Sequence, residues 1–596
     1  MNNILSVYHE RIGRFSSRVS RIKPRRNAVT VARLLSFAAL VWFVYRYFAS
    51  GYDWIYLAAA IGVLVLFLTL VVLDSKITGR IDFLEALKAA SETEIAYLNG
   101  DYSRLPRGNE FADPAHPYSA DLDIFGDDSL FQHINRSFGK ENERLLAEWL
   151  LNGCRSEQTV LDRLEATREL SGKLDLIHDF RASAAISGIE QLDKQAFNVW
   201  EEQPPFFTRK RVKWFVYASV AATLLSWTGV AFSLVSSSVA IAFSLFQLLT
   251  VIVLTKRISS YHDRLGRFMK AFSSYLPLLE VLHRESFRSQ RLGQLYGSLF
   301  SEKRHALKAF RSLNRLLQAF DQRANMLAAS VANGLYLSDL QLILRLDEWA
   351  RQYKPFLKMW LDSVSEIDVL MSMANYRVNH PAYNEPKPGD SVWFEAKNMG
   401  HPLIAESIRV NNDFMVAGEH SLFVVTGANM AGKSTFLRTV GINYVLALSG
   451  NVVCCDSLHF RMVQLFSSMR TSDNLAKGSS YFHAEINRLK QLVEVAEREE
   501  RVFIILDEIL KGTNSHDKLN GSRLFLKRLL SLPVSGLIAT HDLALGELSA
   551  THPDNFRNIC FEIENTPDGI AYDYLLRPGV SQNMNASILL EQLGLI

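Results

Sequence analysis

Two long apolar runs interrupt a chain in which polar and apolar residues are otherwise interspersed. The first covers residues 34–73 with a polar break at 50–53, and its second half, 54–73, carries no charge. The second covers residues 214–255, also without a charge and with a serine-rich break at 233–238. A helix of about 20 apolar residues crosses the hydrocarbon core of a bilayer. Each run therefore predicts a transmembrane helical hairpin, which gives four spans.

The charges around these runs predict their orientation. Lys and Arg are frequent in residues 1–33 and 209–213 and follow the hairpins at Lys76 and Lys256, whereas the turns inside the hairpins carry neither. The positive-inside rule then places both termini and all large segments in the cytoplasm. A cleaved signal peptide is the alternative for the first run, but the basic lead and the second span oppose it. A buried helix pair is the alternative for the second run, and its uncharged length opposes that.

Helical periodicity dominates the rest of the chain up to about residue 389. Apolar residues recur three and four positions apart in 74–213 and 256–389, with a proline-marked irregular connection at 106–117. From residue 390 to 596 the pattern changes to short apolar runs, turns and helices, which is typical of one α/β domain. The predicted fold is a C-terminal α/β domain preceded by an all-α core and lever region that the two transmembrane hairpins interrupt.

Composition and charge exclude few classes of function. The net charge of +3 does not by itself indicate nucleic-acid binding, and the four cysteines lack metal-ligand spacing, which is typical of reduced core residues. Arg and Lys are frequent early in 256–389. A basic helical face of this kind could bind DNA phosphates, lie against anionic lipid or be merely solvated, and the sequence leaves all three open.

The clearest chemistry lies at the start of the α/β domain. An apolar run at 421–426 precedes a G-x-x-x-x-G-K-S stretch that begins at Gly427 and ends with Gly432, Lys433 and Ser434, and helical spacing follows. Strand, glycine loop and helix form the context of a phosphate-binding loop, because backbone N–H groups and the helix N-terminus cradle anions. We expect Lys433 to reach the β/γ-phosphates of a nucleotide and Ser434 to hold Mg²⁺. The domain is therefore predicted to be a P-loop ATPase.

Two further apolar runs deliver polar side chains to the same edge of the predicted sheet. The run at 502–506 ends in Asp507 and Glu508, and the run at 537–540 precedes His541. Asp507 is expected to hold Mg²⁺ through its water shell, and Glu508 to orient or deprotonate the attacking water. His541 would face the same crevice and sense the γ-phosphate.

A glycine–serine turn at residues 477–480 precedes an amphipathic helix. Such a turn at a helix start can bind an anion. Because the chain already supplies one loop for its nucleotide, a second anion site would suit a nucleotide held by a partner subunit. An ordinary helix cap without a ligand is the alternative.

Together these residues resemble the MutS family of mismatch-repair ATPases, a branch of the ABC-type ATPases. The motifs that carry the resemblance are TGANMAGKST, SDNLAKGSSYFHAEI, LDEILKGTNSHD and ATHD. The resemblance is strong over 390–596 and weaker over 120–185 and 355–390, which look like the start and the return of the family's core domain. The family's N-terminal mismatch-reading domain has no counterpart, and the membrane hairpins occupy its place.

The resemblance implies ATP and Mg²⁺ as cofactors and a homodimer with two composite sites. It implies that Asn429 contacts phosphate, that Phe414 stacks on adenine and that Ser480 reaches the nucleotide of the opposite subunit. His541 would be the switch histidine, and with Glu508 it forms the expected catalytic pair. The full set of expected nucleotide and metal residues is Phe414, Gly427, Asn429, Gly432, Lys433, Ser434, Thr435 and Ser480 in trans for ATP, with Ser434 and Asp507 for Mg²⁺.

The sequence therefore predicts a membrane-anchored MutS-like ATPase with slow hydrolysis. Three outputs stay open: binding of DNA, including mismatched DNA, as the family implies; a membrane-coupled ATP switch; and a tethered interaction scaffold with no DNA role. The basic helical segment favours DNA binding, and the absence of a mismatch-reading domain opposes DNA binding. The membrane spans favour the switch.

Overall fold

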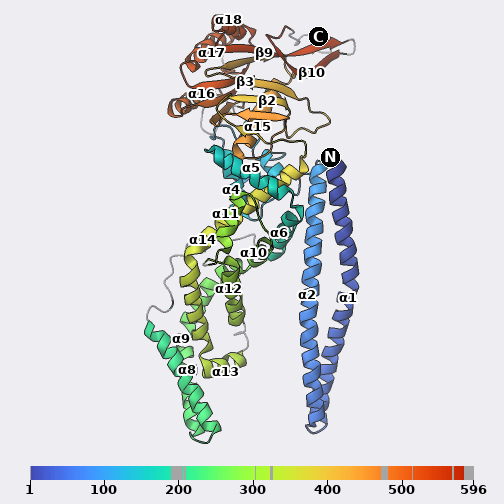
Figure 1. The fold of residues 1–596 in the computed structure, drawn as a ribbon, viewed down its shortest axis with the longest axis vertical. Helices are drawn as coiled ribbons and strands as arrows, with labels where there is room; N and C mark the ends of the chain where they lie inside the picture. Colours follow the sequence, from blue (N-terminus) through green and yellow to red (C-terminus); the bar gives the residue numbers. More distant parts are fainter. Residues whose placement is uncertain are drawn as a thin grey trace.

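An α/β domain lies at one end of the molecule, and two helical hairpins lie toward the other end (Figure 1). Helices connect the two ends, and the turns of both hairpins face away from the α/β domain (Figure 1). The computed structural model describes residues 2–188, 206, 210–302, 304–321, 326–470, 481–512, 514–566 and 569–582.

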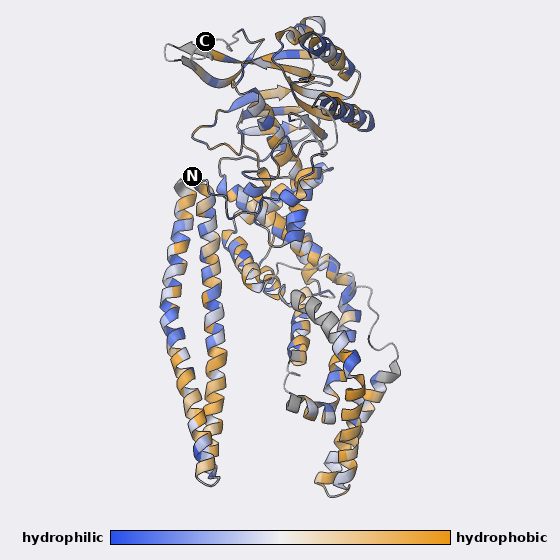
Figure 2. Ribbon diagram, turned by 180° about the vertical axis from the view of Figure 1, so that it is seen from behind, coloured by the Kyte–Doolittle hydropathy of each residue, from blue (hydrophilic) through white to orange (hydrophobic). Residues whose placement is uncertain are grey.

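The first hairpin consists of α1 (Asn2–Ala49) and α2 (Trp54–Leu98). The turn falls at the polar break that the sequence indicates, but both helices extend far beyond the apolar run. The basic segment 1–33, expected to precede the hairpin, is the first part of α1 itself. Figure 2 shows apolar residues concentrated in the half of the hairpin nearest the turn.

The second hairpin consists of α8 (Lys210–Ala231) and α9 (Ser237–Ser273). The two helices share a buried amide, because Gln247 Nε2 on α9 donates to Thr223 Oγ1 at 2.7 Å and to Ser219 O at 3.0 Å on α8. Among the described residues, four helices are long and apolar enough to cross a membrane by length and composition: Ile4–Ala49, Trp54–Leu98, Lys213–Ala231 and Ser237–Tyr261.

Helices form the region between the hairpins and the α/β domain, as the periodicity predicts. The longest, α14 (Ser338–Asn379), has 42 residues and is therefore about 63 Å long. It runs from the level of the second hairpin to the α/β domain (Figure 1). The others are α3 (Leu130–Ile134), α4 (Lys140–Asn152), α5 (Glu157–Ser171), α6 (Leu174–Ser187), α10 (Leu276–His283), α11 (Gln290–Phe300), α12 (Ala306–Asp321), α13 (Met326–Tyr336) and the short 3₁₀ helix η1 (Asn109–Phe111).

A buried polar network fastens the first hairpin to this helical region. Glu94, near the end of α2, is fully buried and pairs with Arg136 at 2.9 Å and Arg181 at 3.0 Å. Asn379 of α14 donates to Glu94 at 2.8 Å and accepts from Tyr8 of α1 at 2.8 Å. Both helices of the hairpin are thus attached, at their ends distant from the turn, by specific contacts rather than by apolar packing alone.

The α/β domain contains a six-stranded sheet in the order β10-β9-β4-β8-β7-β6 and a four-stranded sheet in the order β1-β5-β2-β3. In the larger sheet only β10 runs antiparallel to its neighbour. Its strands are β4 (Leu422–Gly427), β6 (Gln464–Ser468), β7 (Val502–Asp507), β8 (Val534–Ala539), β9 (Phe556–Thr566) and β10 (Gly569–Pro578). The smaller sheet has β1 (Lys387–Pro388), β2 (Phe394–Met399), β3 (Asn412–Val416) and β5 (Ser457–Phe460), and the helices are α15 (Lys433–Ser449), α16 (Tyr481–Arg498), α17 (Ser515–Leu529), α18 (Leu548–Thr551) and the 3₁₀ helix η4 (Leu543–Glu547).

The segment before α3 packs directly on this domain. Asp121 accepts hydrogen bonds from Ser467 Oγ at 2.6 Å and from Arg470 N at 2.8 Å. Leu122 lies so close to α15 that a Cβ added at Gly441 would come within 2.6 Å of it. Helix α15, which begins at the glycine loop, is therefore in direct contact with the helical region.

Candidate functional site

The glycine loop joins β4 to α15, as the sequence predicts. Gly427 has φ +149°, and an added Cβ would meet the carbonyl oxygen of Phe561 at 2.7 Å. Gly432 has φ +105° and directly precedes the first residue of α15, Lys433. Side chains other than hydrogen are disfavoured at both positions. The loop can therefore turn tightly and place its backbone N–H groups beside the N-terminus of the helix.

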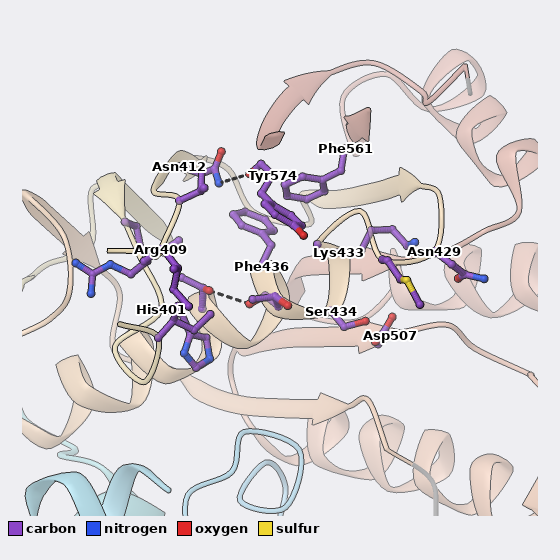
Figure 3. A pocket seen from close by; sticks show the side chains of 18 of the residues that line it. His401, Arg409, Asn412, Asn429, Lys433, Ser434, Phe436, Asp507, Phe561 and Tyr574 are labelled. Carbon is purple, nitrogen blue, oxygen red and sulfur yellow. Dashed lines mark hydrogen bonds between the residues drawn. The ribbon is translucent and has the colours of Figure 1, made fainter. Parts of the chain in front are cut away.

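A cavity of about 720 Å³ opens above this loop, where the carboxyl ends of β4, β7 and β8 meet. This is the edge at which ligands bind in parallel α/β sheets. Figure 3 shows the labelled side chains converging on it. The lining residues that carry polar or aromatic groups are His401, Arg409, Asn412, Asn429, Lys433, Ser434, Thr435, Phe436, Thr439, Asp507, Glu508, Lys511, His541, Phe561 and Tyr574.

Lys433 lies at the base of the cavity and is buried. Its Nζ donates to the carbonyl oxygens of Gly427 and Ala428, each at 2.8 Å. Burial lowers the pKa of Lys433 to about 8, although the carboxylates of Asp507 and Glu508 oppose the change. The ammonium group is thus held by its own loop at the position where phosphate oxygens would replace the carbonyls.

Glu508 and His541 form a direct pair at the rim. His541 Nε2 lies 2.8 Å from Glu508 Oε1, and Lys518 Nζ lies 3.8 Å from Glu508 Oε2. The hydrogen bond with His541 lowers the pKa of Glu508 to about 2, so this carboxylate is ionised at neutral pH. His541 Nδ1 also lies 3.5 Å from Lys433 Nζ, which joins the two predicted catalytic residues to the loop lysine.

Ser434 and Asp507 line the same part of the cavity, and Figure 3 shows their oxygen atoms near one another. A hydroxyl and a carboxylate are hard oxygen ligands, and Mg²⁺ bound with a nucleotide usually takes few protein ligands, with phosphate and water oxygens supplying the rest. This pair therefore fits Mg²⁺. Within the described ranges there is no cluster of three or more His, Cys, Asp or Glu residues that could hold a metal alone.

Phe414, expected to stack on adenine, does not line this cavity. Phe414 is 5% exposed, packs edge-on against Phe423 and Phe436, and is absent from the cavity lining. The prediction that Phe414 stacks on adenine does not fit this position, because its ring lies within the core behind Phe436. Instead Tyr574 lines the cavity, is 41% exposed and lies 3.0 Å from a Cβ placed on Gly432.

Asn412 holds Tyr574 in place. Its Nδ2 donates to Tyr574 O at 3.0 Å, and its Oδ1 accepts from Leu576 N at 2.7 Å. These bonds fix an irregular part of the β9–β10 pairing, between Tyr572 and Leu576. Tyr574 itself adopts φ +55°, which turns it out of the regular strand.

The remaining predicted residues divide into two groups. Asn429 and Thr435 line the cavity with the loop residues. Ser480, expected to act on a partner's nucleotide, lies outside the described residues. Sequence reasoning missed Tyr574, Asn412, Arg409 and Lys511, all of which line the cavity. The position of Lys511, four residues after Asp507, was the one available signal, because it follows the acidic pair in the same loop.

Comparison with known proteins identifies the domain that carries this site. Residues 423–589 match the family model for MutS domain V. The C-terminal part of the chain therefore carries a MutS-type domain V. The match covers the glycine loop, the acidic pair and His541, so the family assignment rests on the same segment as the cavity.

Several curated relatives align with part of this chain. The DNA mismatch repair protein MutS of Ehrlichia ruminantium (strain Gardel) is 31% identical over 222 residues, 37% of this chain and 27% of that protein. That of Ehrlichia chaffeensis is 27% identical over 322 residues, 54% of this chain and 37% of that protein. MutS protein homolog 4 of Homo sapiens is 30% identical over 235 residues, 38% and 24% respectively. The matching region thus spans about a quarter to somewhat over a third of each relative.

Proposed function

We propose that this chain is a membrane-anchored MutS-family ATPase that binds ATP with Mg²⁺ and hydrolyses it slowly. The observation that carries the proposal is the convergence of Lys433, Asp507, Glu508 and His541 on one cavity beside the glycine loop. These residues come from three different strand ends. Such a convergence places a cation for phosphates, a metal ligand and a base within one site.

The loop positions suggest how the phosphates bind. In the structure the Lys433 ammonium is hydrogen-bonded to two backbone carbonyls of its own loop. Phosphate oxygens would replace these neutral acceptors with charged ones, which form stronger bonds. Mg²⁺, held by Ser434 and Asp507, would supply further neutralisation of the phosphate charge.

The pair of Glu508 and His541 supplies the groups for water attack. Glu508 is ionised and can accept a proton from a water molecule or orient it. His541 bonds to Glu508 and lies near Lys433, so a γ-phosphate at Lys433 would come close to both. In this arrangement His541 is bonded to Glu508, the proposed catalytic base. Hydrolysis would require the pair to separate, which accords with a slow enzyme.

The base of the nucleotide would lie against Tyr574. Aromatic side chains bind bases by stacking, with little dependence on base identity. Ile408 and Val410 also line this end of the cavity and are 75% and 40% exposed. The site therefore offers apolar surface at one end and charged groups at the other, as a nucleoside triphosphate requires.

The anchoring part of the proposal rests on the two hairpins. Their apolar halves lie at the end of the molecule opposite the ATPase domain (Figures 1 and 2). Membrane insertion of both hairpins would leave both termini and the ATPase domain on the cytoplasmic side, where the flanking Lys and Arg residues gather. A homodimer, with Ser480 of one subunit at the nucleotide of the other, completes the proposal.

A chain of contacts supports coupling between the nucleotide and the membrane. Arg409, which lines the cavity, donates to Tyr383 Oη at 3.3 Å. Tyr383 stacks on His380 with ring centroids 4.6 Å apart, and His380 Nε2 lies 2.7 Å from the hydroxyl of Tyr97 on α2. The site and the first hairpin are thus linked through packed polar and aromatic side chains, which favours a membrane-coupled switch as the output.

DNA binding remains the second candidate output because the relatives are named DNA mismatch repair proteins. Part of the basic segment is neutralised by ion pairs, since Arg291 pairs with Glu366 and Arg311 with Glu280. Retention of duplex DNA by the full chain, falling steeply with added salt, would support this output. Absence of such retention at low salt would exclude it without touching the ATPase proposal.

The replacement Glu508→Gln tests the ATPase. The variant should lose at least about 100-fold in hydrolysis rate, the usual range for a lost base, while still binding ATP. The exposed Glu499, changed to Gln, provides a matched control that should keep the parental rate. Hydrolysis by Glu508→Gln at the parental rate would reject Glu508 as the base, and absence of ATP binding by the unmodified chain would reject the function.

A further inference from the structure

Helix α13 (Met326–Tyr336) has the sequence MLAASVANGLY and carries no charged residue. It packs on α9 so closely that a Cβ added at Gly334 would lie 3.7 Å from the carbonyl oxygen of Ser244. Ser244 belongs to the apolar span Ser237–Tyr261. A helix from the predicted lever region therefore contacts a membrane-spanning candidate about 10 Å from the end at which its hairpin turn lies.

The neighbouring charges define how far α13 lies from the membrane surface. Lys213 of α8 pairs with Glu348 of α14 at 3.5 Å, and Lys256 follows the apolar part of α9. Ser244 precedes Lys256 by about 18 Å of helix, and α14 begins about 15 Å before Glu348. Measured along both helices, α13 therefore lies about 15–18 Å from the level of Lys213, Glu348 and Lys256. This depth falls within a hydrocarbon core about 30 Å thick.

Two polar groups of α13 have hydrogen-bond partners inside the protein. Asn333 is 4% exposed, and its Oδ1 accepts from Ser338 Oγ at 2.9 Å and from Asp339 N at 3.0 Å. The carbonyl of Tyr336 accepts from Gln341 Nε2 at 2.7 Å. A helix at membrane depth needs such internal partners, because the hydrocarbon offers none.

The exposed side of α13 carries large apolar side chains beside Ser330. Val331 is 63% exposed and Tyr336 is 48% exposed. Exposed apolar residues also lie on α9, among them Val253 at 74%. Transfer of such exposed apolar side chains from water to a water-free environment is favourable in proportion to their apolar area.

We propose that α13 is embedded in the bilayer beside α8 and α9, with Val331 and Tyr336 in contact with lipid acyl chains. The inference rests on the proposed membrane insertion of α8 and α9. It makes the second membrane unit a three-helix element in which α13 does not cross the bilayer. Because α14 starts from α13 and ends at the α/β domain, lipid would hold the far end of that helix directly.

Spin labels on single introduced cysteines test the placement in the full-length protein. The variants are Val331→Cys, Val253→Cys on α9 and Leu524→Cys on α17, where Leu524 is 71% exposed. The four native cysteines are buried, and the unsubstituted protein measures their background labelling. Each protein is placed in vesicles of phosphatidylcholine and phosphatidylglycerol, and collisions of the label with oxygen and with a water-soluble nickel chelate are recorded.

Labels at Val331 and Val253 should both collide with oxygen several-fold more, relative to nickel, than the label at Leu524. A label at Val331 that resembles Leu524, while Val253 reads as lipid-exposed, would overturn the placement of α13 and leave the spans intact. Low collision rates with both reagents at Val331 would show that protein covers the face and would also overturn it. An aqueous reading at Val253 would reject the proposed membrane insertion and this inference together.

Discussion

At the scale of single residues, the proposed nucleotide site is held by contacts among its own groups. Lys433 bonds to two loop carbonyls and Glu508 bonds to His541, so both groups that would act on a triphosphate already have partners. Replacing these partners by a ligand changes the protonation and the hydrogen bonding of the site. Two measurements follow from that exchange.

Binding of ATP should be coupled to proton uptake by Lys433. Its pKa is lowered to about 8 by burial, so at pH 8 about half of the free protein has this group neutral. Phosphate charge favours the ammonium form, so ATP should bind with uptake of about half a proton at pH 8 and should weaken as the pH rises above 8. Calorimetry in buffers of different ionisation enthalpy measures the uptake.

Lys433→Arg is the control for this measurement. Arginine stays protonated throughout the range, so the variant should show no uptake at pH 8 from this position and a flatter affinity profile above it. Equal proton uptake by the two proteins at pH 8 would assign the coupling to another group.

Tyr574 should contribute the base contact. Loss of an aromatic stack costs about 1–3 kcal/mol per base, so Tyr574→Ala should weaken ATP binding by about 5-fold to 150-fold. Tyr574→Phe should keep most of the affinity because the ring remains. Binding of inorganic tripolyphosphate, which has no base, should be nearly unchanged in both variants; an equal loss for ATP and tripolyphosphate would indicate a structural role instead.

These residues show what the sequence can and cannot reveal about such a site. Gly427, Gly432 and Lys433 were predictable because strand, loop and helix are consecutive and the glycines are required by their backbone angles. The place of Tyr574 in the cavity lining was not predictable, because Tyr574 reaches the cavity only after the β9–β10 hairpin folds back and its pairing shifts. Phe414 has the right residue type, but tertiary packing places it in the core.

At the scale of helices, the apolar runs located the turns of both hairpins and underestimated their lengths. Hydrophobicity reports only the part of a helix that lipid would surround. Beyond it, α1 and α2 continue because they pack on each other and on α6, for example through buried Phe15, Val19 and Leu84. Charged residues on the outer faces of this part hid its continuity in the sequence.

The Glu94 network should determine whether the first hairpin stays attached to the core. Glu94→Gln leaves Arg136 and Arg181 buried without a counter-charge, and breaking a buried pair in this way costs about 3–5 kcal/mol. We expect a large fall in the thermal unfolding midpoint of the full-length protein in detergent. Glu92→Gln on the same helix removes only a half-exposed pair with Lys88 and should change stability by less than about 1 kcal/mol.

Similar losses in the two variants would contradict the anchoring role of Glu94. Limited proteolysis adds a local readout, because release of α2 should expose the irregular segment after Leu98 before the α/β domain is cut. A lower unfolding midpoint without earlier cleavage after Leu98 would indicate that the substitution destabilises another part of the protein.

At the scale of the whole molecule, the cavity and the hairpin turns lie at opposite ends, joined by two routes that meet at the C-terminal end of α14, where His380 caps the helix. One route is α14, which carries the second hairpin region to the α/β domain. The other runs from Arg409 through Tyr383 and His380 to Tyr97 on α2. Because the two routes end on different hairpins, a rearrangement at the cavity would move one hairpin relative to the other.

Distances between the hairpin turns should therefore depend on ATP. Spin labels at Leu57→Cys on α2 and Val239→Cys on α9 report this separation, since both positions are exposed and lie near the turns. In vesicles, ATP with Mg²⁺ should shift the distance distribution of the Glu508→Gln protein, whose slow hydrolysis keeps ATP bound. Lys433→Ala should abolish the shift because it removes the phosphate contact. Tyr97→Phe keeps the ring but loses the bond to His380, so it should reduce the shift while leaving ATP affinity unchanged. A full shift in Tyr97→Phe would assign the coupling to α14 alone, and an unchanged distance in the ATP-bound Glu508→Gln protein would contradict coupling by either route.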